Sequence, residues 1–222
     1  MLVLASASPR RRDLLVQAGY RFEVHPAHIP EDPLPGEDPI VYVTRLAREK
    51  AEAVYRELSG ISHRSLDGGD GKEDGPSSGA AGPAGVGRPP LQPVRRPALQ
   101  VLGADTTVTL DNAILGKPED AADAARMLRL LSGRTHRVIT GVALVTATSA
   151  EVAAEVTAVR FLTLSDEEIA EYVATGEPMD KAGAYGIQGR AARWIPRIEG
   201  CYFNVMGLPL ALVSSLLEPW SS

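Results

Sequence analysis

The amino-acid sequence predicts an α/β fold built on a mixed β-sheet. Apolar runs that suit strands are interspersed along the chain with stretches whose apolar residues recur at helical spacing. A serine or aspartate directly before a proline, which is a helix-start signal, precedes two of the helical stretches. Strands and helices mixed in this order form sheets covered by helices. The 222 residues, 44% of them hydrophobic, are sufficient to bury a substantial core.

The first three elements are marked by apolar runs and by the residues at their ends. Residues 1–5, MLVLA, form an apolar run that predicts a buried strand. Ser8 and Pro9 then cap and start a helix, and Gly19 ends it. Residues 20–25 predict a second strand.

A long helix is predicted next, from Asp38 and Pro39 to about Leu58. Its start has a capping residue followed by proline, the usual order at a helix N-terminus. Its apolar residues repeat at helical spacing and therefore share one face. They are Val43, Leu46, Ala47, Ala51, Val54 and Leu58.

The segment from 59 to 99 interrupts this pattern. It contains 9 of the 21 glycines and 6 of the 17 prolines of the chain, with few large apolar residues. Such a composition cannot bury enough surface to offset the entropy of ordering. Because patterned sequence resumes directly afterwards, we expect one domain over residues 1–222 with a disordered surface insertion at about 59–99.

After the insertion the chain again alternates strand and helix signals. Strands are predicted at 101–110, 113–115, 136–147 and 152–164, with a short one near Trp194, and helices at 119–131, 165–173 and from Pro209. Residues 111–112 suit a turn between the first two strands, and Gly133 closes the first of these helices. Ser165 and Glu168 form a capping box. A glycine-rich loop is predicted at 181–189.

Charge and cysteine content exclude several classes of protein. The 28 acidic residues outnumber the 23 lysines and arginines, which argues against a protein that coats nucleic acid. Cys201 is the only cysteine, so no internal disulfide and no multi-cysteine zinc site are possible. Neither a signal peptide nor a run of about 18 apolar residues is present. We therefore expect a cytoplasmic protein without membrane or nucleic-acid partners.

The stretch SPRRR, residues 8–12, indicates an anion site. A strand followed by a tight turn into a helix presents free backbone N–H groups, and Arg10, Arg11 and Arg12 add forked donors for phosphate oxygens. Positive charge at a helix N-terminus opposes the helix dipole, so its presence favours a functional role. The alternative is that the three arginines only solvate the first helical turn.

Three separated lysines are further candidates for binding a polyanion. Lys50 lies in the predicted long helix, Lys117 precedes a proline, and Lys181 opens the glycine-rich loop, where backbone can approach a ligand closely. A phosphate site assembled from several loops needs cations scattered in this way. Taken singly, each lysine is also compatible with a solvated surface position.

Two carboxylates stand at the ends of predicted elements. Asp105 lies in a predicted strand, after VLGA, and Glu31 lies in a proline-rich loop. A carboxylate beside a bound phosphate is repelled unless a divalent cation bridges them or the carboxylate takes a proton from an attacking water. Both situations are typical of phosphoanhydride hydrolysis. The alternative for Asp105 is a turn or edge-strand acid bonded to local backbone.

Several common enzyme motifs are absent. The chain contains no GxxxxGK[ST] and no GxGxxG after a strand, so a P-loop kinase and a Rossmann dehydrogenase are poor interpretations. The four histidines show no HExxH spacing, and no GxSxG nucleophile elbow occurs. Cys201 has no identifiable base nearby in the sequence and is expected to be a small buried residue.

Taken together, six ordered motifs resemble the Maf family of nucleoside triphosphate pyrophosphatases. They cover almost the whole chain except the insertion. They are SASPRRRDLL, YVTRLAREKA, GADTTVTLD, ILGKPEDAADAARMLRLLSGRTHRVITGVAL, YVATGEPMDKAGAYGIQG and NVMGLPL.

This resemblance implies a fold and a reaction. The fold would be an elongated mixed sheet with flanking helices and two lobes around a deep cleft, as in inosine triphosphate pyrophosphatases. The reaction would be hydrolysis of a nucleoside triphosphate to the monophosphate and pyrophosphate with a divalent cation, Mg²⁺ or Mn²⁺. The enzyme would be a cytoplasmic homodimer.

The resemblance also implies roles for individual residues. Asp105 falls on the catalytic acid that accepts a proton from the attacking water, and with Glu31 it would line the metal region. Substrate choice would involve Arg10, Thr106 and Gln188. The phosphate region would be lined by Ser8, Arg11, Arg12, Lys50, Lys117 and Lys181.

The substrate branch follows from the first motif. In the branch acting on 7-methyl-GTP a tryptophan follows the proline of that motif, whereas this chain has Arg10. With AGAYGIQG also present, the chain resembles the dTTP/UTP branch, which would act on normal or modified pyrimidine nucleotides. The alternatives are the 7-methyl-GTP branch and a non-catalytic regulator of cell division. The insertion at 59–99 and the segment RAARWIPRI, 190–198, depart from the family pattern.

Overall fold

A seven-stranded mixed sheet organises the molecule. The computed structural model describes residues 1–60 and 98–218, so the insertion predicted at 59–99 lies, apart from its ends, outside the described residues. The strand order is β2-β1-β3-β5-β6-β7, with β4 paired to β3. The strands are β1 Leu2–Leu4, β2 Phe22–Val24, β3 Gln100–Leu110, β4 Ala113–Leu115, β5 Thr135–Val145, β6 Ala150–Arg160 and β7 Arg197–Glu199.

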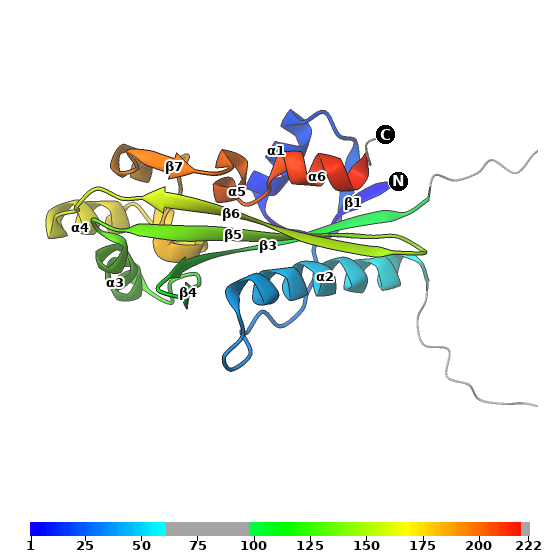
Figure 1. Cartoon of the computed structure of the whole chain (residues 1–222), viewed down its shortest axis with the longest axis horizontal. Helices are drawn as coiled ribbons and strands as arrows, with labels where there is room; N and C mark the ends of the chain where they lie inside the picture. Colours follow the sequence, from blue (N-terminus) through cyan, green and yellow to red (C-terminus); the bar gives the residue numbers. More distant parts are fainter. Residues whose placement is uncertain (61–97, 219–222) are drawn as a thin grey trace, which may run out of the picture.

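The strand directions confirm the predicted mixed sheet. β1 is parallel to both of its neighbours, β2 and β3. β3, β5, β6 and β7 pair antiparallel in that order. β3, β5 and β6 have 11 residues each and run along the long axis of the molecule, which gives it an elongated shape (Figure 1).

Helices cover both faces of the sheet. They are α1 Pro9–Gln17, α2 Pro39–Leu58, α3 Ala121–Leu131, α4 Asp166–Ala174, α5 Tyr202–Met206 and α6 Leu210–Leu217. α2 lies along one face, and α1, α5 and α6 lie on the other, while α3 and α4 gather at one end (Figure 1). The described part of the chain has no helix that combines the length and apolar character needed to cross a membrane.

The predicted caps form as the sequence indicates. The side chains of Ser8 and Asp38 accept bonds from backbone N–H groups in the first turns of α1 and α2. Ser165 and Glu168 make the reciprocal capping box of α4. Local residue choice therefore sets where these helices begin.

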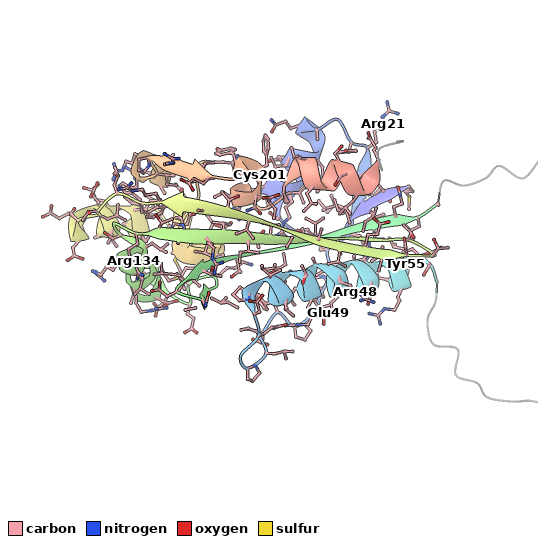
Figure 2. All side chains as sticks on the ribbon, viewed as in Figure 1. Arg21, Arg48, Glu49, Tyr55, Arg134 and Cys201 are labelled. Atoms are coloured by element: carbon pink, nitrogen blue, oxygen red, sulfur yellow. The ribbon has the colours of Figure 1, made fainter. Side chains whose placement is uncertain are left out.

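Side chains from the helices and the sheet fill two hydrophobic layers (Figure 2). The larger layer packs α1, α3 and α6 against the sheet and includes Leu14, Leu128 and Val213. The smaller one joins α2 to the other face through residues such as Ala47, Ala51 and Val101. Burial on both faces explains why β3 and β5 are apolar along most of their length.

α2 lies unusually close to β3 and β5 because two glycines face it. A Cβ atom on Gly103 of β3 would lie 2.1 Å from the backbone oxygen of Ala47, and one on Gly141 of β5 would lie 2.3 Å from that of Val43. No side chain fits at either position without moving the helix backbone. The two glycines therefore fix how deeply α2 sits on the sheet.

The C-terminal part contains the differences from the sequence prediction. The short strand predicted near Trp194 is present as β7 at Arg197–Glu199, but Trp194 itself belongs to a 3₁₀ turn, Arg190–Trp194. Trp194 stays outside the strand because its ring packs edge-on against Tyr172 and its Nε1 donates a hydrogen bond to Glu168. α5 was not predicted, and Cys201, which precedes it, is only partly buried (Figure 2).

We predict that Gly103→Ala destabilises the protein by about 3 kcal/mol, because an added methyl group in a filled layer forces backbone to shift. Urea unfolding followed by circular dichroism would measure the loss. Gly116→Ala is the matched control, since no heavy atom lies within 4 Å of its added Cβ. Equal stability of the two variants would contradict the proposed role of Gly103 in seating α2.

A buried histidine gives the fold an acid sensitivity. His136 on β5 is 2% exposed, its Nε2 lies 2.8 Å from the hydroxyl of Tyr185, and its ring packs edge-on against Phe161 and Tyr185. Its Nδ1 has no hydrogen-bond partner among the described residues. Burial lowers the pKa of His136 from 6.5 to about 4, so the folded protein holds a neutral ring.

We predict that this histidine costs stability as the pH falls. The unfolded chain takes up the proton near pH 6.5 and the folded chain only near pH 4, so the free energy of unfolding decreases through that window. Between about pH 7.5 and about pH 5 the loss is about 2 kcal/mol. Urea unfolding of wild type and His136→Gln at both pH values measures it. An unchanged difference between the two proteins would contradict the prediction.

Candidate active site

A large cleft opens between the helices around α2 and the elements at the opposite end of the sheet. Its volume is about 990 Å³, at the upper end of the range of roughly 300 to 1,000 Å³ for small-molecule sites. It is lined by the β1–α1 turn, the loop before α2, α2 itself, β3, β4 and segment 177–189. All predicted site residues except Arg12 line it.

Lys50 joins two carboxylates in this cleft. Its Nζ lies 2.7 Å from Oδ1 of Asp105 on β3 and 2.7 Å from Oε1 of Glu31 in the loop before α2. The side chains of Lys50 and Asp105 are 8% and 10% exposed, whereas that of Glu31 is half exposed. Since both carboxylates contact one ammonium group, their near oxygens lie within two hydrogen-bond lengths of each other.

The surroundings shift the two carboxylates in opposite directions. Burial raises the pKa of Asp105 above its ordinary value, more than the charges of Lys50 and Arg11 lower it. Burial also acts to raise the pKa of Glu31, but Lys50, with smaller effects of Lys117 and Arg11, outweighs it and lowers that pKa. Asp105 is thus the better proton acceptor of the two, and Glu31 stays ionised.

Asp105 and Thr106 are consecutive residues of β3, and their side chains lie on opposite faces of the sheet. Side chains alternate along a strand, so Asp105 points toward α2 and Thr106 points toward α1. There Arg11 donates to Oγ1 of Thr106 at 3.0 Å and to the carbonyl oxygens of Ala104 and Gly207, both at 2.8 Å. With a further bond to Ser6, most donors of Arg11 are used inside the protein. Arg11 therefore braces α1 against β3 while it lines the cleft.

Asp180 links two predicted cations. Its Oδ2 accepts from Nη1 of Arg10 at 3.0 Å, and its Oδ1 accepts from Nζ of Lys181 at 2.6 Å. The Lys181 ammonium also donates to the backbone oxygen of Glu177 at 2.6 Å. Arg10 comes from α1 and Lys181 from the far segment, so Asp180 holds the two sides of this part of the cleft together.

The remaining predicted residues take simpler positions. Ser8 caps α1 and lines the cleft. Gln188 is exposed on the far segment, and Lys117 is exposed after β4. No ion pair joins Lys117 to any residue that the structure describes, so its charge is available to a ligand.

The expectation that Arg12 lines the phosphate region is not met. Its side chain is 57% exposed and pairs with Asp13, and it is not part of the cleft lining. The reason is helix geometry: each residue is turned by about 100° from the last, so three successive arginines cannot share one direction. Arg10 and Arg11 point to the cleft, and Arg12 points to solvent.

Two residues of the site were missed at the sequence level. Tyr42 of α2 lines the cleft, and its hydroxyl donates to the backbone oxygen of Glu31 at 2.8 Å. Asp180 was passed over although it directly precedes Lys181. Tyr42 lies eight residues before Lys50 in the motif YVTRLAREKA, and this i, i+8 spacing is the signal that places both toward one side of a helix.

The donor chemistry of the cleft fits a magnesium-type ion that also binds substrate. The described residues contain no cluster of three or more His, Cys, Asp or Glu side chains able to hold a metal ion alone. Mg²⁺ commonly binds through one or two carboxylates, waters and substrate phosphates. Glu31 and Asp105 are such a pair, because Lys50 takes only one oxygen of each.

These features define an α/β protein whose cleft suits a phosphorylated ligand, with two carboxylates set among several cations. Comparison with known proteins agrees with this class. The family model described as Maf-like protein matches residues 1–220, and the chain belongs to this family.

Individual relatives cover nearly the whole chain. A protein of Koribacter versatilis named dTTP/UTP pyrophosphatase is 47% identical over 217 residues, which are 98% of this chain and 93% of the relative. One of Aromatoleum aromaticum with the same name is 46% identical in an alignment of 226 positions, gaps included, that covers 98% of this chain and 94% of the relative. A third, from Chromobacterium violaceum and also so named, is 45% identical over 216 residues, 97% and 92% respectively.

Proposed function

We propose that this protein is a nucleoside triphosphate pyrophosphatase that hydrolyses dTTP and UTP to the monophosphate and pyrophosphate. The observation that carries the proposal is that nearly buried Lys50 contacts both nearly buried Asp105 and half-exposed Glu31 inside a cleft of nucleotide size. The names of relatives at about 45% identity support the choice of substrates.

Asp105 acts as the general base in this proposal. It takes a proton from a water whose oxygen bonds to the α-phosphorus, while the bond from that phosphorus to the bridging oxygen breaks and pyrophosphate leaves. The raised pKa of Asp105 makes it a stronger base than an exposed carboxylate. Lys50 holds Oδ1, so Oδ2 is the oxygen that serves both the proton and the proposed cation, through its two separate lone pairs.

The cations stabilise the charge of the triphosphate and of the leaving pyrophosphate. Lys117 is exposed to the cleft, and Arg10 and Lys181 face it from opposite sides. Fixed donors in a partly enclosed site favour the negative charge that develops on the leaving group without further reorganisation. The residues proposed to select the nucleobase of the substrate are Arg10, Thr106 and Gln188.

A divalent cation, Mg²⁺ or Mn²⁺, is proposed as the cofactor. Glu31 and Asp105 would hold it, and when bound it would neutralise phosphate charge beside the attacking water. The ionised state of Glu31 supports this role, because its pKa is lowered. The homodimer expected from the family resemblance remains a prediction that light scattering of the purified protein would test, and the cytoplasmic location remains a prediction as well.

The proposal is tested with a panel of nucleotides and Mg²⁺ or Mn²⁺. We expect dTTP and UTP to give equimolar monophosphate and pyrophosphate, separated by ion-exchange chromatography. Release of orthophosphate would mean that another bond is cut. Preference for 7-methyl-GTP would overturn only the substrate assignment, and no turnover of any nucleotide would favour a non-catalytic regulator.

Asp105→Asn is expected to lower kcat for dTTP by about 10² to 10⁴-fold, the usual contribution of a general base. Circular dichroism at the assay temperature should show the variant folded, because asparagine keeps an acceptor for Lys50 and Glu31 still pairs with that ammonium group. Asp13→Asn is the matched control, since Asp13 pairs with Arg12 outside the cleft. Retained activity of Asp105→Asn would contradict its assignment as the base.

Arg10→Ala and Arg12→Ala are expected to behave differently although they are neighbours of equal charge. Loss of Arg10 should lower kcat/KM for dTTP about tenfold or more, the value of one charge-assisted hydrogen bond. Loss of Arg12 should change it less than about twofold, because that side chain faces solvent. Steady-state kinetics at one ionic strength measure both, and equal losses would refute the assignment.

A further inference from the structure

The loop that carries Glu31 is long and has little structure of its own. It connects β2 to α2 over residues 25–38, and the segment from 30 to 36 is exposed throughout. An exposed loop of this length does not by itself hold a carboxylate in a fixed place. Glu31 nevertheless meets Lys50 at 2.7 Å. Other contacts must therefore restrain the loop.

Arg45 of α2 supplies the strongest of these contacts. Its Nε and Nη2 each lie 2.7 Å from one carboxylate oxygen of Glu37, a two-pronged ion pair. Glu37 is almost buried, with 5% of its side chain exposed, and its pKa is lowered to about 2, mainly by the hydrogen bonds from Arg45. The carboxylate also accepts from the backbone N–H of Leu34 at 3.0 Å. The end of the loop is thus tied to α2.

Two further hydrogen bonds restrain the backbone of Glu31 and Asp32. Arg45 Nη2 donates to the carbonyl oxygen of Asp32 at 3.3 Å, and the Tyr42 hydroxyl donates to that of Glu31 at 2.8 Å. Burial, with help from nearby carboxylates, raises the pKa of Tyr42 to about 12, so the phenol keeps its proton to donate. The Arg45 guanidinium stacks over the Tyr42 ring at 5.8 Å.

We propose that Tyr42, Arg45 and Glu37 form a clamp that positions Glu31 opposite Asp105 and so sets the affinity of the cleft for a divalent cation. The inference rests on the proposed function for the use of that cation. None of the three touches the reacting atoms in this scheme, so they are positioning residues. They act through the backbone of residues 31–32, while Lys50 acts on the Glu31 side chain.

The clamp residues of α2 lie on one side of the helix, beside Lys50. Tyr42, Arg45 and Glu49 are spaced three and four residues apart and share one side of α2, and Glu49 lies 3.3 Å from Arg45. Lys50 lies next to this row on the side that meets the sheet. One helix, seated at a fixed depth, therefore holds the Glu31 carboxylate, its carbonyl group and the end of its loop.

The test measures Mn²⁺ binding in the presence of dTMP, whose phosphate supplies the ligand oxygens that the two carboxylates leave to the substrate, from the free Mn²⁺ signal in electron paramagnetic resonance. Arg45→Met should weaken binding about tenfold or more, within the usual effect of removing a residue that orients a ligand. Tyr42→Phe and Glu37→Gln should act in the same direction. Arg45→Lys should be intermediate, because lysine keeps the charge but not the two-pronged geometry.

Arg48→Met is the matched control. Arg48 lies on the same helix and pairs with Glu52, outside the cleft lining (Figure 2). The Arg48→Met substitution removes the same positive charge as Arg45→Met but no contact to the loop that carries Glu31, so the affinity for Mn²⁺ should stay within about twofold of wild type. Equal weakening by Arg48→Met and Arg45→Met would overturn the clamp.

Hydrogen exchange of the loop gives a readout that does not involve metal. In Arg45→Met, the amides of Leu34 and Glu37, which donate hydrogen bonds within this loop, should exchange faster while those of β5 stay protected, as expected for local opening. If Arg45→Met does not fold, Tyr42→Phe carries the same test with one hydroxyl removed. Wild-type Mn²⁺ affinity in folded clamp variants, or unchanged exchange, would overturn the proposal.

Failure of the clamp and failure of the proposed function are separable. The proposed function fails if unsubstituted protein releases no pyrophosphate from any nucleotide. The clamp fails if Mn²⁺ binding and loop exchange are insensitive to Tyr42, Arg45 and Glu37, whatever the turnover. An unsubstituted protein that binds no Mn²⁺ in the presence of dTMP would also overturn the clamp.

Discussion

The close approach of α2 to β3 and β5 is the constraint on which the rest of the site depends. Gly103 and Gly141 allow the helix backbone to contact the sheet, where any side chain would hold it away. At that depth Lys50 reaches Asp105, two residues beyond Gly103 on the same face of β3. A helix held further from the sheet would carry the start of the Lys50 side chain away from Asp105 and so weaken this contact.

The charges brought together in this way are expensive to bury. Taking an ammonium and a carboxylate from water costs several kcal/mol per ion, and their attraction repays it only with good geometry. The pKa of Asp105 is raised because the charges of Lys50 and Arg11 do not fully compensate the desolvation of its carboxylate. A purely structural position would be better served by apolar residues. Retaining the charges is therefore most simply explained by chemistry at Asp105.

Local signals in the sequence predict most helices and strands, whereas contacts between residues far apart in the chain could not be predicted. Caps at Ser8 and Asp38 and the apolar stripe of α2 depend on neighbours in the chain, and they were predicted with nearly correct bounds. The bridge from Arg10 to Asp180 spans 170 residues, and no local pattern encodes it. The predicted short strand begins three residues after Trp194, because Trp194 lies in a 3₁₀ turn and its ring contacts Tyr172 of α4, a contact that local propensity does not indicate.

The three consecutive arginines of α1 show how one helical turn divides a single charge cluster into different tasks. Arg10 points across the cleft to Asp180, Arg11 points inward to backbone oxygens of two other elements, and Arg12 points to solvent beside Asp13. Composition cannot distinguish them, since each adds the same charge at the same end of the helix. Rotation of about 100° per residue does. The repulsion between adjacent guanidinium groups is reduced because each faces a different acceptor, and this lets a net acidic protein concentrate positive charge where a polyanion would enter.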